Sequence, residues 1–239
     1  MKLNTNSNIY TIVYASVMVI VVAFCLACVS ELLRPRQETN VANDKRSQIL
    51  AALNIRNVEN VQEEYGRVLL RDMIIDINGN VLQENGGFDV ESKQILAKDD
   101  AAKRLPVYVC KVESDTLYVL PLFGRGLWGE LWGYLALKDD FRTVYGMFMS
   151  HASETAGLGA RITEEQFQNK FIGKQTFGDG DFSTVLLGVK KKVEAPGSEV
   201  DAITGATLTS NGVDEMFKTS LAPYRKFFET SVAPATSLN

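Results

Sequence analysis

A run of residues without charge near the N-terminus is the feature that most constrains how this chain can fold. No charged residue occurs from Leu3 to Ser30, and residues 12–29 within that run are almost wholly apolar. A stretch of this length is near the lower limit for a helix that crosses roughly 30 Å of hydrocarbon. A signal peptide has a shorter apolar region, about 7–15 residues, followed by a small-residue cleavage site that is not evident here. We therefore predict an uncleaved membrane anchor in residues 1–34, with residues 9–30 in the membrane.

Two features of the anchor leave alternatives open. Leu26-Ala27-Cys28 is compatible with a lipoprotein site, at which Cys28 would be acylated and the preceding residues lost. Cys25 and Cys28 also form a C-x-x-C pair, although we expect these thiols to act as small apolar side chains within the lipid. Basic residues flank the run on both sides, so the positive-inside rule does not decide its orientation.

The composition changes after the anchor. Residues 35–43 are polar and indicate a linker, and apolar residues at helical spacing follow. We therefore predict a linker and a short helix in residues 35–60. Residues 61–239 are predicted to form one soluble domain, which is long enough to bury its own hydrophobic core.

Within this domain the predicted strands outnumber the helices and do not alternate strictly with them. An alternating run over residues 67–77 leads into Asn78-Gly79, the favoured two-residue hairpin turn, and then into Val81-Leu82. This order predicts an α+β fold after a single transmembrane helix, rather than a doubly wound α/β sheet. Further strands are expected at residues 107–112, 116–122, 131–137 and 185–193, and helices at residues 164–171 and 212–224.

Charge and residue counts exclude several classes of site. The formal net charge is −4 and no long block of Lys or Arg occurs, so we predict no nucleic-acid partner. The sequence has one histidine and three cysteines, too few for a zinc or haem site built on several such ligands. No metal site is therefore predicted.

A glycine-rich segment at residues 124–129, Gly-Arg-Gly-Leu-Trp-Gly, matches the pattern G-x-G-x-x-G. That pattern binds dinucleotides where a helix opens at the last glycine. Residues 131–135 suit a strand instead, so we reject the dinucleotide interpretation. Two interpretations remain: a loop whose glycines let the backbone approach a planar ligand beside Trp128, and a tight turn with core tryptophans.

A polar segment with several glycines runs from His151 to Gly159, before the predicted helix at Glu164. Such a loop can present hydroxyl, carboxylate and amide groups to the polar edge of a ligand. His151 and Glu154 are candidates for a general acid–base pair, although a single histidine is more often structural.

The segment from Asp201 to Ser210 is rich in hydroxyl groups and leads into the last predicted helix. Ser210 or Asn211 is expected to cap that helix. Hydroxyl groups at a helix N-terminus, with Gly205 and Ala206 leaving room, favour a bound phosphate group. The alternative is a capped helix after a Thr/Ser-rich turn.

The same segment resembles the flavinylation signature of the FMN-binding domain family, Asp-x-x-(Ser/Thr)-Gly-Ala-Thr. Every specified position is matched, by Asp201, Thr204, Gly205, Ala206 and Thr207. The resemblance implies that Thr207 carries FMN through a phosphoester bond, delivered from FAD by a separate flavin transferase. It also implies that the other matched residues form the local cofactor-binding scaffold.

Two further segments resemble the same family. Residues 120–129 look like its glycine–tryptophan segment, and residues 151–159 resemble its Glu-Thr-Pro-Gly-Leu-Gly loop, with Ala156 where proline is usual. The resemblance implies that the ring or ribityl chain of FMN is surrounded by Leu127, Trp128, Glu154, Thr155, Leu158 and Gly159.

The N-terminal third is similar to the opening of the C subunits of Na⁺-translocating NADH:quinone reductases, with Arg34-Pro35-x-Gln37 after the single anchor. This resemblance implies an electron-transfer subunit of a six-subunit membrane complex. Its FMN would pass electrons between an iron centre and the FMN of the B subunit, with no side chain acting as a catalytic acid or base. The anchor would lie in the inner membrane, with the soluble domain on the periplasmic side.

Other functions are compatible with the sequence. The G subunit of the Rnf electron-transport complex shares the flavinylation signature, and the partner subunits encoded nearby would distinguish it. A non-enzymatic membrane-anchored sensor or binding protein would lack covalent flavin. A structural lipoprotein would be acylated at Cys28.

Overall fold

The chain divides into two compact units, and the boundary between them falls inside the long N-terminal helix α1 (Asn8–Ala52). The computed structural model describes residues 7–232, and the units comprise residues 1–45 and 46–239. An 18-residue window of α1 has a mean hydropathy of 2.8, and none of it is buried. The helix is therefore long and apolar enough to serve as a single membrane anchor.

The linker predicted at residues 35–43 is wrong, because α1 continues through it with Pro35 inside the helix. A proline removes one N–H donor and crowds the carbonyl group four residues earlier, so its effect on a long helix is local. Good helix formers lie on both sides, and Arg34 pairs with Glu31 and Glu38 at 3.5 and 3.2 Å. The polar composition reflects an exposed helix and not a loop.

The last turns of α1 pack into the second unit, so this compact unit begins before the predicted boundary at residue 61. Ile49, Leu50 and Leu53 are at most 1% exposed, which confirms their helical spacing. They pack against helix α2 (Val61–Val68), whose Asn60 cap accepts a hydrogen bond from the N–H of Glu63. The strand predicted at residues 67–77 therefore begins too early, because its first two residues end α2.

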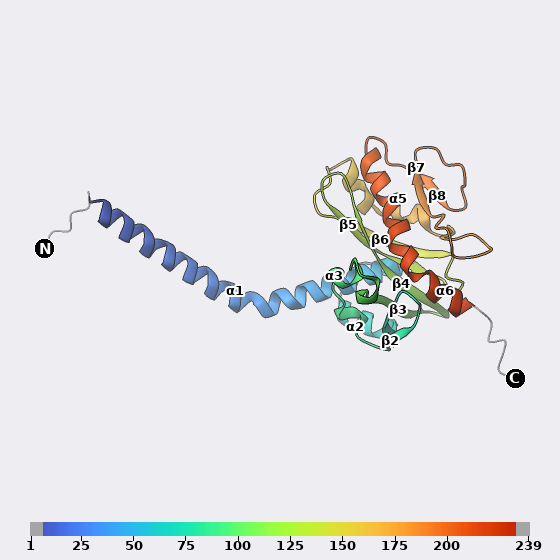
Figure 1. The fold of residues 1–239 in the computed structure, drawn as a ribbon, viewed down its shortest axis with the longest axis horizontal. Coiled ribbons are helices and arrows are strands. Elements are labelled where there is room, and N and C mark those ends of the chain that lie inside the picture. The colour runs from blue at the N-terminus through green and yellow to red at the C-terminus, as the bar shows by residue number, and fades with distance from the viewer. Residues whose placement is uncertain (1–6, 233–239) are drawn as a thin grey trace. The chain divides into compact units, whose positions relative to one another are not determined.

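The second unit is built on a six-stranded antiparallel sheet with the order β2-β1-β3-β4-β5-β6 (Figure 1). The hairpin around Asn78-Gly79 and the three predicted strands that follow it are confirmed. The turn is longer than the predicted two residues, because β1 ends at Ile75, β2 begins at Val81, and the N–H of Asp76 donates to the carbonyl of Asn80 at 3.0 Å. Strand β6 was absent from the prediction, because its residues show no clean polar–apolar alternation. The strands are β1 (Leu69–Ile75), β2 (Val81–Gln83), β3 (Leu105–Val112), β4 (Asp115–Arg125), β5 (Glu130–Leu137) and β6 (Val144–His151).

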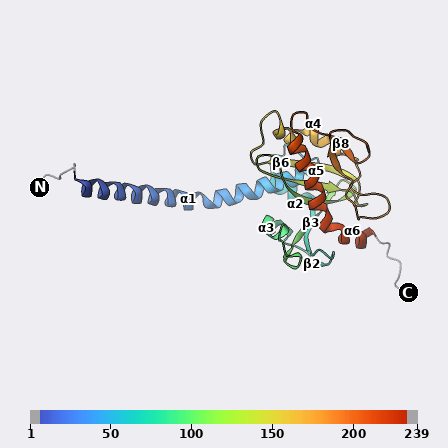
Figure 2. The same ribbon diagram turned by 45° about the horizontal axis from the view of Figure 1, so that its top comes forward.

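Both faces of the sheet are covered, as successive residues of β3 illustrate. Tyr108 and Cys110 join the cluster formed with α2 and the end of α1, whereas Val107 and Val109 join the larger cluster on the other face. Helix α5 (Thr207–Leu221) packs across the second face, with α6 (Arg225–Val232) following it (Figure 2). Short helices α3 (Ser92–Ile95) and α4 (Glu165–Gln168) complete the α+β fold.

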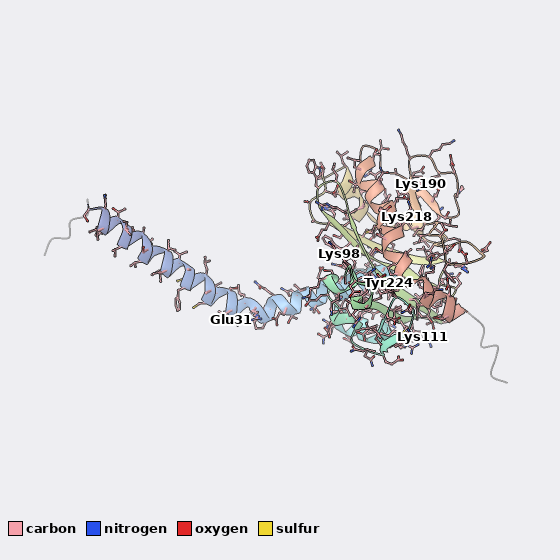
Figure 3. The ribbon with its side chains drawn as sticks, in the orientation of Figure 1. Glu31, Lys98, Lys111, Lys190, Lys218 and Tyr224 are labelled. Carbon is pink, nitrogen blue, oxygen red and sulfur yellow. The ribbon has the colours of Figure 1, made fainter. Side chains whose placement is uncertain are left out.

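The strand predicted at residues 185–193 is reduced to β7 (Gly188–Lys190), which pairs in parallel with β8 (Glu199–Asp201) outside the main sheet. Asp214 of α5 holds β7 in place. Its Oδ1 accepts the N–H of Val189 at 3.0 Å, and its carboxylate binds the ammonium groups of Lys190 and Lys218. Figure 3 labels these two lysines, one on β7 and one on α5. Pairing with only one short strand limits the length of β7.

Helix α5 begins at Thr207, earlier than predicted at residue 212, and Ala206 is its N-cap. The expected caps Ser210 and Asn211 already lie inside the helix. The N–H of Ser210 donates to the carbonyl of Ala206 at 2.9 Å, while its hydroxyl accepts the N–H of Ile203 at 3.1 Å. Ser210, in the first turn of the helix, therefore stabilises the turn that precedes it.

Candidate functional site

Three segments that are far apart in the sequence meet at the carboxylate of Glu154. Its Oε1 accepts the backbone N–H of Trp128 at 2.8 Å, in the β4–β5 loop. Its Oε2 accepts the hydroxyl of Thr209 at 2.5 Å, in the first turn of α5. Glu154 is 7% exposed and Thr209 is 2% exposed. The glycine-rich loop, the 151–159 loop and the hydroxyl-rich segment thus form one site.

Two glycines make room for this carboxylate. A Cβ at Gly126 would overlap its Oε1, and a Cβ at Gly159 would lie 2.5 Å from both Oε2 and the Thr209 hydroxyl. Neither position accepts a side chain without moving the carboxylate. The glycines that the sequence suggested for approach to a ligand serve here to admit Glu154.

Thr207 is exposed and occupies the first position of α5. Within the described chain, no carbonyl or side chain accepts the backbone N–H groups of Thr207, Leu208 and Thr209. Free N–H groups at the positive end of a 15-residue helix suit a phosphate group. The residues present at this position therefore fit the phosphate end of FMN.

Gly205 lies in the turn that leads the backbone into α5, two residues before Thr207. Its φ of +80° favours glycine, and a Cβ there would lie 2.9 Å from Cδ2 of Leu158. Leu158 is thereby placed next to the turn before α5. Thr204 is exposed in this turn, Ala206 is buried, and Asp201 ends β8 at an exposed position.

Exposed apolar side chains surround this part of the surface. Leu127, Trp128 and Leu158 are 47%, 65% and 42% exposed, and Leu208 beside Thr207 is 58% exposed. Exposed apolar side chains grouped on one part of a surface commonly mark a binding site. The prediction missed Leu208, and it missed Thr209 as the partner of Glu154. The Thr-x-Thr spacing at the start of α5 was the available signal.

His151 does not form an acid–base pair with the side chain of Glu154. It ends β6, opposite Leu131, and its Nδ1 accepts the backbone N–H of Glu154 at 3.1 Å. The carbonyl of Thr155 accepts the N–H groups of Leu158 and Ala160, both at 3.1 Å. These contacts order the loop, which supports the structural interpretation of the histidine.

The glycine-rich segment leads into a strand and not a helix, which confirms the rejection of the dinucleotide interpretation. It is a tight turn, but Trp128 is 65% exposed, so the alternative with core tryptophans is wrong for this residue. The N–H of Gly126 donates to the carbonyl of Gly129 at 2.8 Å, and β5 begins at Glu130. Gly129 packs against Ser153, whose hydroxyl donates to the carbonyl of Trp128 at 2.9 Å. Over residues 7–232, no group of three or more His, Cys, Asp or Glu side chains is arranged to hold a metal ion.

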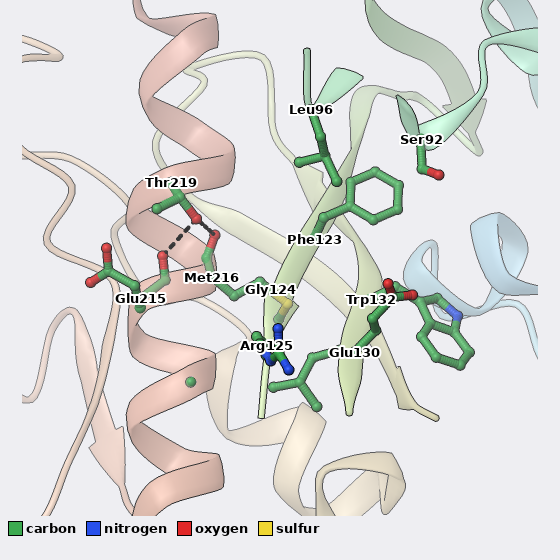
Figure 4. Close-up of a pocket in the computed structure, with 12 residues that line it drawn as sticks. Ser92, Leu96, Phe123, Gly124, Arg125, Glu130, Trp132, Glu215, Met216 and Thr219 are labelled. Atoms are coloured by element: carbon green, nitrogen blue, oxygen red, sulfur yellow. Dashed lines mark hydrogen bonds between the residues drawn. The ribbon is translucent and has the colours of Figure 1, made fainter. Parts of the chain in front are cut away.

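A cavity of about 420 Å³ lies between α3, the β4–β5 hairpin and α5 (Figure 4). Its size falls in the range of ligand pockets. None of the predicted site residues lines it, so it is distinct from the site around Glu154. Its apolar lining comes from Leu96, Phe123, Leu131, Trp132 and Met216, and its charged lining from Arg125, Glu130 and Glu215.

Comparisons with known proteins agree with this arrangement. Residues 126–222 match the family model of the FMN-binding domain, a range that includes Trp128, the 151–159 loop and the segment from Asp201 to Ser210. The chain is 32% identical over 235 residues to the C subunit of the Na(+)-translocating NADH-quinone reductase of Haemophilus ducreyi, with 91% of each chain covered. The C subunit of the same reductase from Chlamydia muridarum is 44% identical over 149 residues, which cover 55% of this chain and 46% of that protein.

Solved structures show the same fold. The crystal structure of the Na(+)-translocating NADH-quinone reductase C subunit from Parabacteroides distasonis is 37% identical with a TM-score of 0.74, covering 87% of this chain and 98% of that one. Shewanella oneidensis NqrC, at 23% identity and a TM-score of 0.68 over 80% of this chain, shares the fold. The chain therefore belongs to the family of the C subunits of Na(+)-translocating NADH-quinone reductases.

Proposed function

We propose that this chain is a covalent-FMN electron-transfer subunit of a Na⁺-translocating NADH:quinone reductase, with FMN attached through a phosphoester to Thr207. The observation that carries the proposal is the exposed Thr207 at the start of α5, beside three backbone N–H groups for which residues 7–232 provide no acceptor. The match of this segment to the flavinylation signature supports it, as does the family of the chain.

Attachment requires an exposed nucleophile and a group to leave. The Thr207 oxygen would attack the FMN phosphorus of FAD on the flavin transferase, forming the P–O ester bond. The pyrophosphate bond breaks, AMP leaves, and the hydroxyl proton is released. Exposure of Thr207 suits access by a separate enzyme, and the free N–H groups of α5 can bind the phosphate oxygens after transfer.

FMN supplies one- and two-electron chemistry when bound. The residues of this chain would hold it and limit its contact with water. Leu127, Trp128, Leu158 and Leu208 are the exposed apolar side chains available to pack against the ring. Thr155 and Gly159, with the turn formed by Asp201, Thr204, Gly205 and Ala206, would complete the cofactor environment.

The position in the complex follows from the family. Electrons from NADH would arrive through the FAD and iron–sulfur cluster of another subunit and an iron centre, and would leave for the FMN of the B subunit and then quinone. Sodium translocation would belong to the multi-helix subunits, because one anchor helix cannot enclose a channel. Helix α1 would lie in the inner membrane, with the FMN-binding domain on the periplasmic side.

The test is the mass of the protein purified from its native membrane with an active flavin transferase. We expect a peptide containing Thr207 to carry one FMN phosphoester, and Thr207→Ala to carry none. Thr219→Ala, at another exposed position of α5, is the matched control and should keep the flavin. An unmodified Thr207 in cells with an active transferase would overturn the proposal.

A further inference from the structure

The carboxylate of Glu154 forms no ion pair with a Lys or Arg side chain among residues 7–232. The ionisable side chain that acts on it is His151. The Nδ1 of His151 accepts the backbone N–H of Glu154. The carboxylate itself accepts the N–H of Trp128 and the hydroxyl of Thr209, so the dipoles of these donors stabilise its charge.

These dipoles are sufficient to keep the carboxylate ionised. Burial opposes ionisation, but hydrogen bonds from the Thr209 hydroxyl and from the N–H groups of Trp128 and Gly129 hold the pKa of Glu154 below its usual range. The N-terminal end of α5 carries a partial positive charge that favours an acid at this place. At neutral pH the site thus contains a buried negative charge.

The position of this charge is fixed. Thr209 is the third residue of α5, two residues after Thr207, so the carboxylate lies against the same helical turn that presents the Thr207 hydroxyl. Gly126 and Gly159 enclose the carboxylate on its other sides. A carboxylate held by hydrogen bonds from two other segments keeps its charge at one place relative to Thr207.

We propose that Glu154, held by Thr209, supplies a fixed negative charge at the flavin site and lowers the reduction potential of the FMN carried on Thr207. This inference rests on the proposed function. Reduction adds electrons to the cofactor, and a buried charge of the same sign raises the free energy of the reduced form, because screening is weaker there than in water. Glu154 and Thr209 are positioning residues, with no part in a chemical step.

The experiment measures the midpoint potential of the flavin by spectroelectrochemical titration of the full chain in detergent, after mass spectrometry has confirmed the flavin on Thr207. Glu154→Gln keeps the size of the side chain and removes its charge, so we expect a more positive potential. Glu164→Gln removes an acid whose side chain is 45% exposed and paired with Arg161, and should leave the potential unchanged. Thr209→Val should shift the potential in the same direction as Glu154→Gln but less, and Thr209→Ser should restore it.

The outcomes separate this inference from the proposed function. A wild-type chain without flavin on Thr207 contradicts the proposed function. A fully flavinylated Glu154→Gln chain with the wild-type potential overturns the fixed-charge inference alone, as does an equal shift in Glu164→Gln. If Glu154→Gln does not fold, Thr209→Val is compared with Thr209→Ser, and equal potentials in these two overturn the inference.

Discussion

Gly212 of α5 lies so close to the carbonyl oxygen of Arg125, at the end of β4, that no side chain fits between them. A Cβ at Gly212 would overlap this oxygen and would lie 3.2 Å from Cα of Gly126. Helix α5 therefore rests directly on the strand that leads into the Trp128 loop. This backbone contact fixes the distance between the first turn of α5, which carries Thr207 and Thr209, and the loop that binds Glu154.

Gly212→Ala should destabilise the chain by about 1–3 kcal/mol, because overpacking exceeds the roughly 1 kcal/mol by which alanine favours a helix over glycine. Gly66→Ala in α2 is the matched control, since nothing lies within 4 Å of its Cβ. That variant should be more stable by about 0.5–1 kcal/mol. Urea unfolding of the full chain in detergent checks both, and shifts of the same sign would contradict the close contact.

Gly205→Ala should lower the fraction of chains that carry flavin. Its φ of +80° strains any L-residue by about 1–2 kcal/mol, and its Cβ would displace Leu158 from the surface beside Thr207. Gly173→Ala has the same backbone strain at φ +77° with nothing within 4 Å of its Cβ. The ratio of flavin to protein absorbance measures loading. Equal losses in both variants would show that strain alone, and not Leu158, is responsible.

Local signals in the sequence were enough for much of the fold. The anchor followed from an unbroken apolar run, and the hairpin at Asn78-Gly79 and strands β3 to β5 followed from turn chemistry and alternation. The three segments of the site were also recognisable one by one. Each of these features is encoded in one continuous stretch of the chain, which is what pattern rules can detect.

Features that depend on contacts between distant residues were missed. The bond between Thr209 and Glu154 joins residues 55 positions apart, and no local pattern indicates that these two side chains meet. The same holds for β6, which is held as a strand by β5, and for the last turns of α1, whose burial moves the domain boundary. The polar composition of residues 35–43 misled the prediction, because an exposed helix can be polar on every side.

The contribution of Asp214 to stability should depend on pH. Burial opposes its ionisation, but Lys218, Lys190 and the N–H of Val189 hold the pKa of this carboxyl below 3.8. A lowered folded pKa means that the stabilisation is complete above the unfolded value and is lost as the pH falls through the folded value. Asp214→Asn should therefore cost about 1–2 kcal/mol at pH 7, since both lysines are partly exposed, and progressively less in acid.

Urea unfolding at several pH values between 7 and 2 tests this dependence. Glu194→Gln is the control, because its carboxylate is 77% exposed and lies 3.9 Å from Lys192, so its effect should stay within about 0.5 kcal/mol at every pH. A stability difference for Asp214→Asn that does not shrink in acid would show that the carboxylate charge is not its source.

Two buried tyrosines should respond in opposite ways to loss of the hydroxyl. Tyr224 is 1% exposed and donates to the carbonyl of Pro106 at 3.0 Å, so Tyr224→Phe removes a buried hydrogen bond and should cost about 1 kcal/mol. Tyr65 is 6% exposed, and its hydroxyl finds no partner among residues 7–232. Tyr65→Phe removes an unsatisfied polar atom and should be neutral or stabilise by about 1 kcal/mol.

Both changes delete one oxygen from an aromatic ring, so comparing their urea midpoints isolates the hydrogen bond. Equal destabilisation would show that the Tyr65 hydroxyl is satisfied in solution.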